Sequence, residues 1–306
     1  MLSEVLEVSS EQCGERLDKF LCEIYPDRSR SFFQNLIKEE RITLSGTALK
    51  ANYKIREGDK ISVEIPEPVE TEILAEPIPL DILYEDEDVL IVNKPKDMVV
   101  HPSAGHISGT LVNAVMYHCK DSLSGINGQI RPGIVHRIDK DTTGSLIICK
   151  NDESHVAIAE QIKVHSVHRV YVGIVCGNIR EEEGTIDKPI GRHPIDRKKM
   201  AINEKNGKSA VTHYKVLERF GAYTFAQFRL ETGRTHQIRV HMASIGHPLL
   251  GDEVYGSGRN HRKGLQGQCL HARTIGFVHP STGEQIEVSA PIPAYMEALL
   301  QKLRQS

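Results

Sequence analysis

A short charged segment, residues 136–145, constrains the fold of this chain more than any other feature. It reads His-Arg-Ile-Asp-Lys-Asp-Thr-Thr-Gly-Ser, and short apolar runs that are typical of strands flank it at 134–135 and 146–148. Charged side chains are costly to bury without partners, so this segment cannot belong to an ordinary core. A charged loop held between two buried strands is instead suited to a rigid chemical site. Two chemical interpretations of the loop exist, and the rest of the chain decides between them.

The composition indicates a folded protein of two domains. The chain has 306 residues, of which 39% are hydrophobic, so it can bury a sizeable core. No run approaches the ~18 apolar residues of a membrane helix, and the first residues lack the basic and apolar regions of a signal peptide. We therefore expect a soluble cytoplasmic protein without a membrane partner. The six cysteines form no CxxC pair, which predicts reduced thiols and no structural zinc.

Negative charge is concentrated in one segment. Residues 66–88 contain nine acidic side chains, four prolines and no basic residue, whereas the rest of the chain carries 38 bases against 32 acids. This composition is typical of an extended, solvated connector, so we expect a domain boundary near residues 66–80. We assign residues 13–75 to a small N-terminal domain, 76–88 to an acidic connector and 89–306 to a second domain. The net charge of −3 therefore does not exclude a nucleic acid as partner.

The N-terminal domain has the pattern of two helices followed by short strands. Apolar residues at i, i+3, i+4 and i+7 from Leu17 predict one helix. A second helix is predicted around residues 32–37, and either Ser29 or Ser31 can cap it. Alternating residues predict strands at 42–44 and 60–65. A unit of about fifty residues has little core of its own.

The order of these elements resembles the S4 RNA-binding domain, which grips structured RNA through basic side chains near its helices. The matching residues are 16–21, 29–31, 36–38 and 58–61. The resemblance implies that Arg16, Arg30 and Lys38 bind RNA, with shape and phosphate contacts dominating recognition. The alternative is that these bases form an ordinary solvated helix face.

The second domain lacks the regular βαβ alternation of a parallel sheet. Strand-like runs occur at 88–93, 170–175, 211–216, 223–230 and 286–288. Helices are predicted from Thr110, over 156–164 with Asp152 as cap, and over 296–303. We therefore predict an α+β protein, with a small N-terminal S4-like domain and a second domain built on a mixed, largely antiparallel sheet flanked by helices.

One interpretation of the loop takes residues 139–143 as DxDxT, the phosphotransfer motif of haloacid-dehalogenase-like enzymes. There the first aspartate attacks phosphorus beside a bound magnesium ion. That motif follows a wholly apolar strand, whereas His136 and Arg137 stand directly upstream in this chain. It also requires a parallel βαβ fold and a downstream acidic pair, which the sequence does not indicate.

The other interpretation covers nearly the whole chain. Residues 136–144 resemble the signature of the RluA-type RNA pseudouridine synthases, residues 169–173 their second motif and residues 232–241 their third. The segments 189–193, 247–252 and 270–272 also fit the family, and an N-terminal S4 unit is typical of its RluD-like branch. The resemblance implies an isomerase that converts uridines in RNA to pseudouridine, with large-subunit ribosomal RNA as the expected substrate and without a metal or cofactor.

The same resemblance implies the roles of individual residues. Asp139 is the essential carboxylate, which attacks the ribose, attacks the uracil or removes a ribose proton. Arg239 pairs with it, because a planar guanidinium can grip a carboxylate. Tyr171 offers a ring for the uracil and a phenol to remove the C5 proton. Arg137 fills the gap that the extruded base leaves in the RNA; a salt bridge from Arg137 to Asp141 or to the connector is the alternative.

Further residues near these motifs are expected to contact RNA. Residues 191–208 carry six bases, including Arg192, which we expect to contact phosphate beside the RNA site. His236 and His241 flank Arg239 and are expected to alternate across a strand, in packing or RNA contact rather than metal binding. We expect a monomer. The competing function is an S4-type RNA-binding or ribosome-assembly factor without catalytic activity, and the intact reactive set argues against it.

Overall fold

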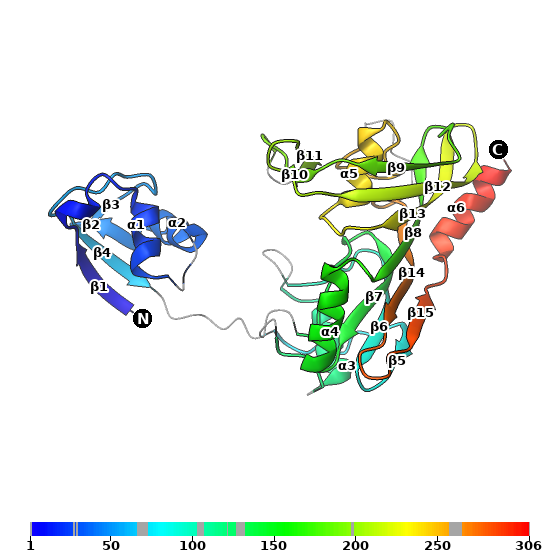
Figure 1. Ribbon diagram of the computed structural model, residues 1–306, viewed down its shortest axis with the longest axis horizontal. Helices are drawn as coiled ribbons and strands as arrows, with labels where there is room; N and C mark the ends of the chain where they lie inside the picture. Colours follow the sequence, from blue (N-terminus) through cyan, green and yellow to red (C-terminus); the bar gives the residue numbers. More distant parts are fainter. Residues whose placement is uncertain are drawn as a thin grey trace. The chain divides into compact units, whose positions relative to one another are not determined.

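The computed structural model describes the chain except residues 1, 27, 29, 66–72, 103–106, 121, 127–131, 197–198, 257–264 and 306, and of residues 2 and 31 it describes only the backbone. The chain divides into two compact units, residues 1–71 and 72–306, which are drawn in Figure 1. No helix among the described residues is long and apolar enough to cross a membrane.

The N-terminal unit has two helices and a four-stranded antiparallel sheet in the order β1-β4-β2-β3. Leu17 and Phe20 of the first helix, Phe33 of the second and Val63 of β4 share one buried core. Both predicted helices and both predicted strands are confirmed, whereas β1 was not predicted. Ser29 and the side chain of Ser31, the two predicted caps, lie outside the described residues. The elements are β1 (Leu2–Glu7), η1 (Ser10–Gln12), α1 (Leu17–Ile24), α2 (Arg30–Lys38), β2 (Ile42–Leu44), β3 (Thr47–Ala48) and β4 (Lys60–Ile65).

The second unit is built on a nine-stranded sheet in the order β5-β6-β7-β14-β8-β13-β12-β9, with β15 paired to β14. Only β7 and β14 run parallel, so the predicted mixed, largely antiparallel sheet is confirmed. Strands β10 and β11 form a separate hairpin. The elements are β5 (Ile82–Glu85), β6 (Val89–Lys94), α3 (Leu111–Cys119), β7 (Thr143–Cys149), α4 (Asp152–Lys163), β8 (His168–Cys176), β9 (Glu183–Asp187), β10 (Ile190–Arg192), β11 (Met200–Ile202), β12 (Val211–Arg219), β13 (Tyr223–Leu230), α5 (Gln237–Ser244), β14 (Leu270–Val278), β15 (Gln285–Ser289) and α6 (Ala294–Arg304).

Helices cover both faces of this sheet, as the alternation along β8 shows. Tyr171 and Val175 point to one face and share a core with residues of α3. Val172 and Ile174 point to the other face and share a core with α6, which runs beside the sheet in Figure 1. Strand β8 is therefore buried on both faces, and this burial holds Tyr171 in a rigid position.

Part of the predicted acidic connector is a strand. Residues 82–85 form β5, which pairs antiparallel with β6, Glu85 opposite Leu90. Leu83 and Tyr84 pack against a core that includes Val89 and Ile91. The prediction of a connector over 76–88 was therefore wrong for these residues, because the apolar side chains between the acids join the sheet.

The upstream flank of the charged loop differs from the prediction, whereas the downstream flank, 146–148, lies in β7 as predicted. Residues 134–135 belong to no strand, and Ile134 forms only an isolated bridge with Ile148. The reason is visible at Ile147, whose backbone N–H donates to Nε2 of His136 at 2.9 Å, so that a side chain takes the place of a strand partner. Helix α4 is capped by Asn151 rather than by the predicted Asp152.

Candidate active site

An arginine of α5 joins two carboxylates at the centre of the site. Nη1 of Arg239 donates to Oδ2 of Asp139 at 3.0 Å. The other edge of the guanidinium grips Asp252, with Nε to Oδ2 at 2.7 Å and Nη2 to Oδ1 at 3.0 Å. The expected pairing of Arg239 with Asp139 is thus present in the structure. Asp252 was not anticipated, although it ends the family-like segment 247–252.

Burial and charge set the electrostatics of this group. The Asp252 side chain is fully buried and also accepts the backbone N–H groups of Val254 and Tyr255. Burial disfavours the charge on Arg239, but the hydrogen bond to Asp252 and the charges of both carboxylates raise its pKa above the usual value. Asp139 keeps 20% of its side chain exposed. The site therefore presents one accessible carboxylate, Asp139, which is paired with the buried and permanently charged guanidinium of Arg239.

Strand β14 brings Tyr171 next to the charged loop. Ala272 of β14 lies opposite Tyr171 of β8 on one side and opposite Gly144 of β7 on the other. Gly144 has φ +111°, and a Cβ there would lie 2.2 Å from the carbonyl oxygen of Ala272. Only glycine permits this approach. The end of the loop and Tyr171 are therefore one strand apart, although 27 positions separate Gly144 from Tyr171 in the sequence.

Tyr171 is 8% exposed and lines a small hollow together with Asp139 and Arg239. Burial raises the pKa of its phenol, while the nearby Arg169 guanidinium acts in the opposite direction. The phenol is therefore protonated in the free protein at neutral pH. The three residues predicted to be catalytic thus meet at one place.

The segment around Arg239 is helical, and the predicted strand was wrong. Residues 237–244 form α5, and His236 stands at its N-terminus with φ +57°. Because residues three apart share a face of a helix, His236 and Arg239 both approach Asp139; Nε2 of His236 lies 3.8 Å from Oδ1. His241 is instead buried, between the hydroxyl of Thr212 and the carbonyl of Lys188. The strand was predicted wrongly because polar and apolar residues alternate along this buried helix, as they do along a half-buried strand.

Lys94, at the end of β6, binds the backbone of the charged loop. Its side chain is fully buried. Nζ donates to the carbonyl oxygens of Pro95 at 2.7 Å, Met98 at 2.7 Å and Lys140 at 2.9 Å. Burial lowers the pKa of Lys94 to about 7, against the charges of nearby aspartates, Asp141 first among them. The lysine was not singled out from the sequence; its position directly after a buried strand was the available signal.

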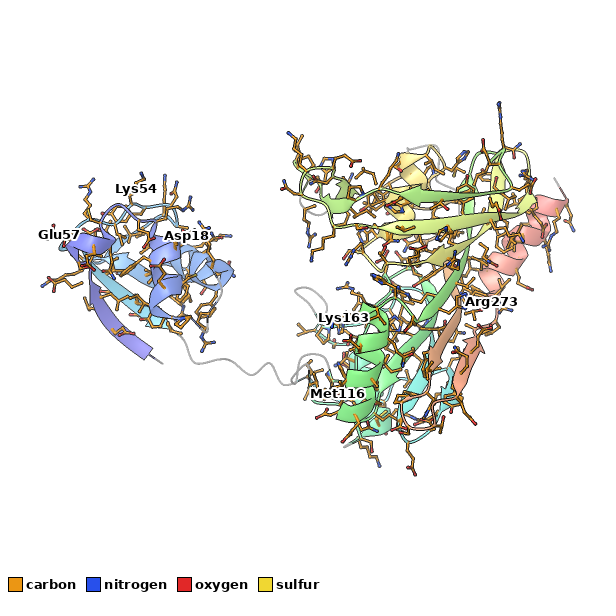
Figure 2. All side chains as sticks on the ribbon, in the orientation of Figure 1. Asp18, Lys54, Glu57, Met116, Lys163 and Arg273 are labelled. Carbon is orange, nitrogen blue, oxygen red and sulfur yellow. The ribbon has the colours of Figure 1, made fainter. Side chains whose placement is uncertain are left out.

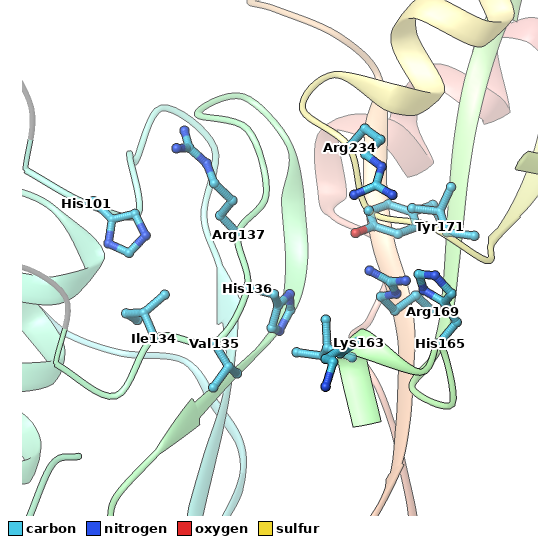
Figure 3. A pocket seen from close by; sticks show the side chains of 13 residues that line it. His101, Ile134, Val135, His136, Arg137, Lys163, His165, Arg169, Tyr171 and Arg234 are labelled. Atoms are coloured by element: carbon cyan, nitrogen blue, oxygen red, sulfur yellow. The ribbon is translucent and has the colours of Figure 1, made fainter. Parts of the chain in front are cut away.

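A cavity of about 630 Å³ opens beside Tyr171. Figure 3 shows His101 and Arg137 on one side, with Arg169, Tyr171 and Arg234 on the opposite side. Among the described residues, the lining contains four arginine or lysine side chains and no aspartate or glutamate. Its volume and charge suit an anionic ligand with a flat ring.

Arg137 lies at the edge of this cavity with an exposed side chain. It also lines the hollow that contains Asp139. No carboxylate of the described residues forms an ion pair with Arg137, so the alternative salt bridge to Asp141 is absent from the described part of the chain. Arg137 is thus accessible to a ligand.

In the N-terminal unit, two of the predicted RNA-binding arginines hold a buried carboxylate. Asp18 of α1, labelled in Figure 2, is fully buried. Arg16 and Arg30 each donate two hydrogen bonds to it, at 2.9 to 3.1 Å. Burial opposes ionisation, but these hydrogen bonds hold the pKa of Asp18 below its usual range. The side chains of Arg16 and Arg30 nevertheless remain 45% and 51% exposed.

The two other predicted RNA contacts lie at the surface. Lys38 is exposed at the last position of α2. Arg192 is exposed at the end of β10, in the hairpin of β10 and β11.

The described residues contain one group with metal-ligand geometry, Asp86, Asp88 and His279. None of its members belongs to the charged loop. Asp86 also accepts hydrogen bonds from the hydroxyl of Tyr84 and from two backbone N–H groups, so we interpret the group as a hydrogen-bonded turn. Strand β6 pairs antiparallel with β7, whereas the phosphotransfer interpretation requires a parallel sheet.

The geometry can now be compared with known proteins. A family model described as RNA pseudouridylate synthase matches residues 88–244, which include the loop, Tyr171 and Arg239. The chain belongs to the RNA pseudouridylate synthase family. An S4 domain model matches residues 15–61 of this pseudouridine synthase. As a member of the family, the protein is an isomerase that converts uridine in RNA to pseudouridine.

Relatives of this pseudouridine synthase align over almost its whole length. It is 52% identical to an uncharacterised RNA pseudouridine synthase, YlyB, of Bacillus subtilis, over 98% of both chains. It is 44% identical to ribosomal large subunit pseudouridine synthase D of Pseudomonas aeruginosa, over 100% of this chain and 97% of the relative. Among solved structures, human RNA pseudouridylate synthase domain containing 1 is 26% identical, with a TM-score of 0.57 over 79% of this chain and 98% of the other.

Proposed function

We propose that this pseudouridine synthase modifies large-subunit ribosomal RNA in the cytoplasm, as a monomer, with Asp139 as its reactive group. The observation that carries the assignment of Asp139 is its ion pair with Arg239 beside the buried Tyr171. Asp139 shares a small hollow with this arginine and this ring, and Arg137 and Tyr171 line both the hollow and the cation-lined cavity. The names of relatives such as that of Pseudomonas aeruginosa support the choice of RNA.

The reaction that these residues would perform has no net redox change. The N1–C1′ bond of uridine breaks, the uracil turns, and a C1′–C5 bond forms. C5 then loses its proton, and N1, which carries no hydrogen in uridine, gains one. Asp139 opens the reaction by attack on the ribose, by attack on the uracil or by removal of a ribose proton, while Arg239 donates a hydrogen bond to it. Tyr171 supports the uracil ring and accepts the C5 proton, which requires its raised pKa to fall once RNA is bound.

The target uridine has to leave its helix before it can reach Asp139, which costs a few kcal/mol. Arg137 is exposed at the edge of the cavity and would fill the gap that the base leaves. Arg16, Arg30, Lys38 and Arg192 would contact phosphates of the RNA. Arg16 and Arg30 would do so with guanidinium edges that their hydrogen bonds to Asp18 hold in place.

Release of tritium from ribosomal RNA that carries 5-tritiated uridine tests this proposal. The wild-type protein should release label, and Asp139→Asn should reduce release to background while still binding the RNA. Mapping of pseudouridines in ribosomal RNA from cells without the protein should reveal the missing positions in the large subunit. Full release by Asp139→Asn would contradict the role of Asp139, and an unchanged large-subunit map would contradict the substrate.

A further inference from the structure

Arg169 of β8 is a buried cation with an incomplete set of partners. The residue is only 6% exposed. Nη2 donates to the carbonyl oxygen of Glu231 at 3.1 Å, whereas Nε has no hydrogen-bond partner. No described carboxylate forms an ion pair with Arg169. A buried guanidinium normally has its charge and its donors matched, because burial of an unmatched charge is strongly unfavourable.

The surroundings of Arg169 increase this mismatch. It lines the 630 Å³ cavity beside Tyr171, and Arg234 lies on the same side (Figure 3). Burial lowers the pKa of Arg169; Tyr171 acts against this shift, and the positive charge of Arg234 adds to it. His136, across the cavity, accepts a backbone N–H through Nε2 and is neutral, so it brings no negative charge. The other cations of the lining are Arg137 and Lys163, of which Lys163 is paired with Glu160.

A glycine leaves room for the guanidinium of Arg169 at the wall of the cavity. Gly233 stands beside it, and a Cβ at this position would lie 2.5 Å from Nη1 of Arg169. Arg234 is anchored by Nε to the carbonyl of Ser209 at 3.0 Å. The two guanidinium groups therefore reach the cavity from adjacent anchored positions.

We propose that Arg169 and Arg234 form a receptor for one phosphate group of the RNA, next to the uracil position at Tyr171. This inference rests on the proposed function, because it identifies the ligand of that cavity as the backbone of the RNA substrate. The phosphate supplies the negative charge that Arg169 lacks in the free protein. Binding of this phosphate fixes the ribose of the target nucleotide relative to Asp139, since one nucleotide carries both groups.

Arg169→Met tests the receptor, with unmodified large-subunit ribosomal RNA transcript as the probe. The logarithm of the affinity, plotted against the logarithm of salt concentration, should have a slope smaller by about one than for wild type, because one phosphate contact is lost. Affinity should fall about tenfold or more at moderate salt. The melting temperature of the free protein should stay equal or rise, because an unmatched buried charge is removed. A purely structural arginine would lower it.

Two variants complete the experiment. Arg304→Met removes a surface arginine that pairs with Glu218, and it should leave the salt slope unchanged. Gly233→Ala keeps the charge but displaces the guanidinium, and it should weaken RNA binding. An unchanged salt slope in Arg169→Met overturns the receptor whatever its melting temperature. If that variant does not fold, wild-type affinity in Gly233→Ala overturns it. Absence of tritium release by wild-type protein would contradict the proposed function without affecting this binding measurement.

Discussion

The hydroxyl of Tyr255 lies 2.8 Å from Nδ1 of His236. The same hydroxyl accepts the backbone N–H of Met200 in β11 at 2.9 Å, which leaves its own proton available for donation to the imidazole. Burial lowers the pKa of His236, which favours the neutral imidazole. With Nδ1 accepting the hydroxyl proton of Tyr255, the proton of the ring lies on Nε2. That nitrogen faces Oδ1 of Asp139 at 3.8 Å. Tyr255 thus selects the tautomer that presents an N–H to the reactive carboxylate.

Tyr255→Phe should slow the reaction without abolishing it. Loss of this hydroxyl frees the imidazole to adopt the other tautomer, at a cost of about 1 kcal/mol, or about fivefold in rate. Single-turnover tritium release measures this effect. Tyr117→Phe, which changes an exposed tyrosine of α3, provides the matched control and should react at the wild-type rate. Equal rates for Tyr255→Phe and Tyr117→Phe would contradict a role of Tyr255 in the reaction.

Asp252→Asn should destabilise the protein and inactivate it. The substitution removes one of the two negative charges that compensate Arg239, while the shape of the side chain is kept. Breaking a buried pair costs about 3–5 kcal/mol of unfolding free energy. Denaturant titration measures this loss. Glu218→Gln breaks a surface pair with Arg304 and should cost less than about 1 kcal/mol. Similar losses in both variants would contradict the structural importance of Asp252.

Gly144→Ala should separate the loop from Tyr171. A Cβ at Gly144 would meet the Ala272 carbonyl at 2.2 Å, so β7 and β14 could no longer pair as they do. We expect a loss of more than about 3 kcal/mol in unfolding free energy and no detectable tritium release. Gly283→Ala is the control: φ is +71° there as well, but nothing lies near the new Cβ, so only about 1 kcal/mol should be lost.

The stability of the protein should depend on His136 in acid. Burial, with the charge of Arg169, lowers the pKa of His136 to about 3, compared with 6.5 in the unfolded chain. Between these values the unfolded state binds a proton that the folded state does not. Stability therefore falls as the pH falls from about 6.5 towards 3, by about 1.4 kcal/mol per pH unit from this group.

His136→Gln isolates this contribution. Glutamine can still accept the Ile147 N–H but does not titrate, so the variant should lose stability less steeply with falling pH. Urea unfolding at pH 6.5 and pH 5 compares the two slopes. Parallel slopes for variant and wild type would show that His136 is protonated in the folded protein.

Local patterns in the sequence were sufficient for many elements. The spacing of Leu17 and Phe20 predicted α1, and the alternation from Tyr223 predicted β13. Such periodicities are visible within a few residues because one face of each element is buried. The acid-rich segment was wrongly predicted to be a connector over its whole length. It contains β5, whose apolar side chains join a sheet, and the other strands of this sheet come later in the chain.

The sequence by itself determined the chemistry that the site offers: an aspartate, a tyrosine and an arginine in three motifs of one family. Only the tertiary structure decided how these groups are supported. Asp252 acts through Arg239, which lies on a helix rather than a strand, and Tyr255 acts through His236 at the N-terminus of that helix. The unmatched charge of Arg169 is equally a property of the fold. Whether a buried charge has a partner depends on strands that are distant in sequence, and short-range patterns carry no information about them.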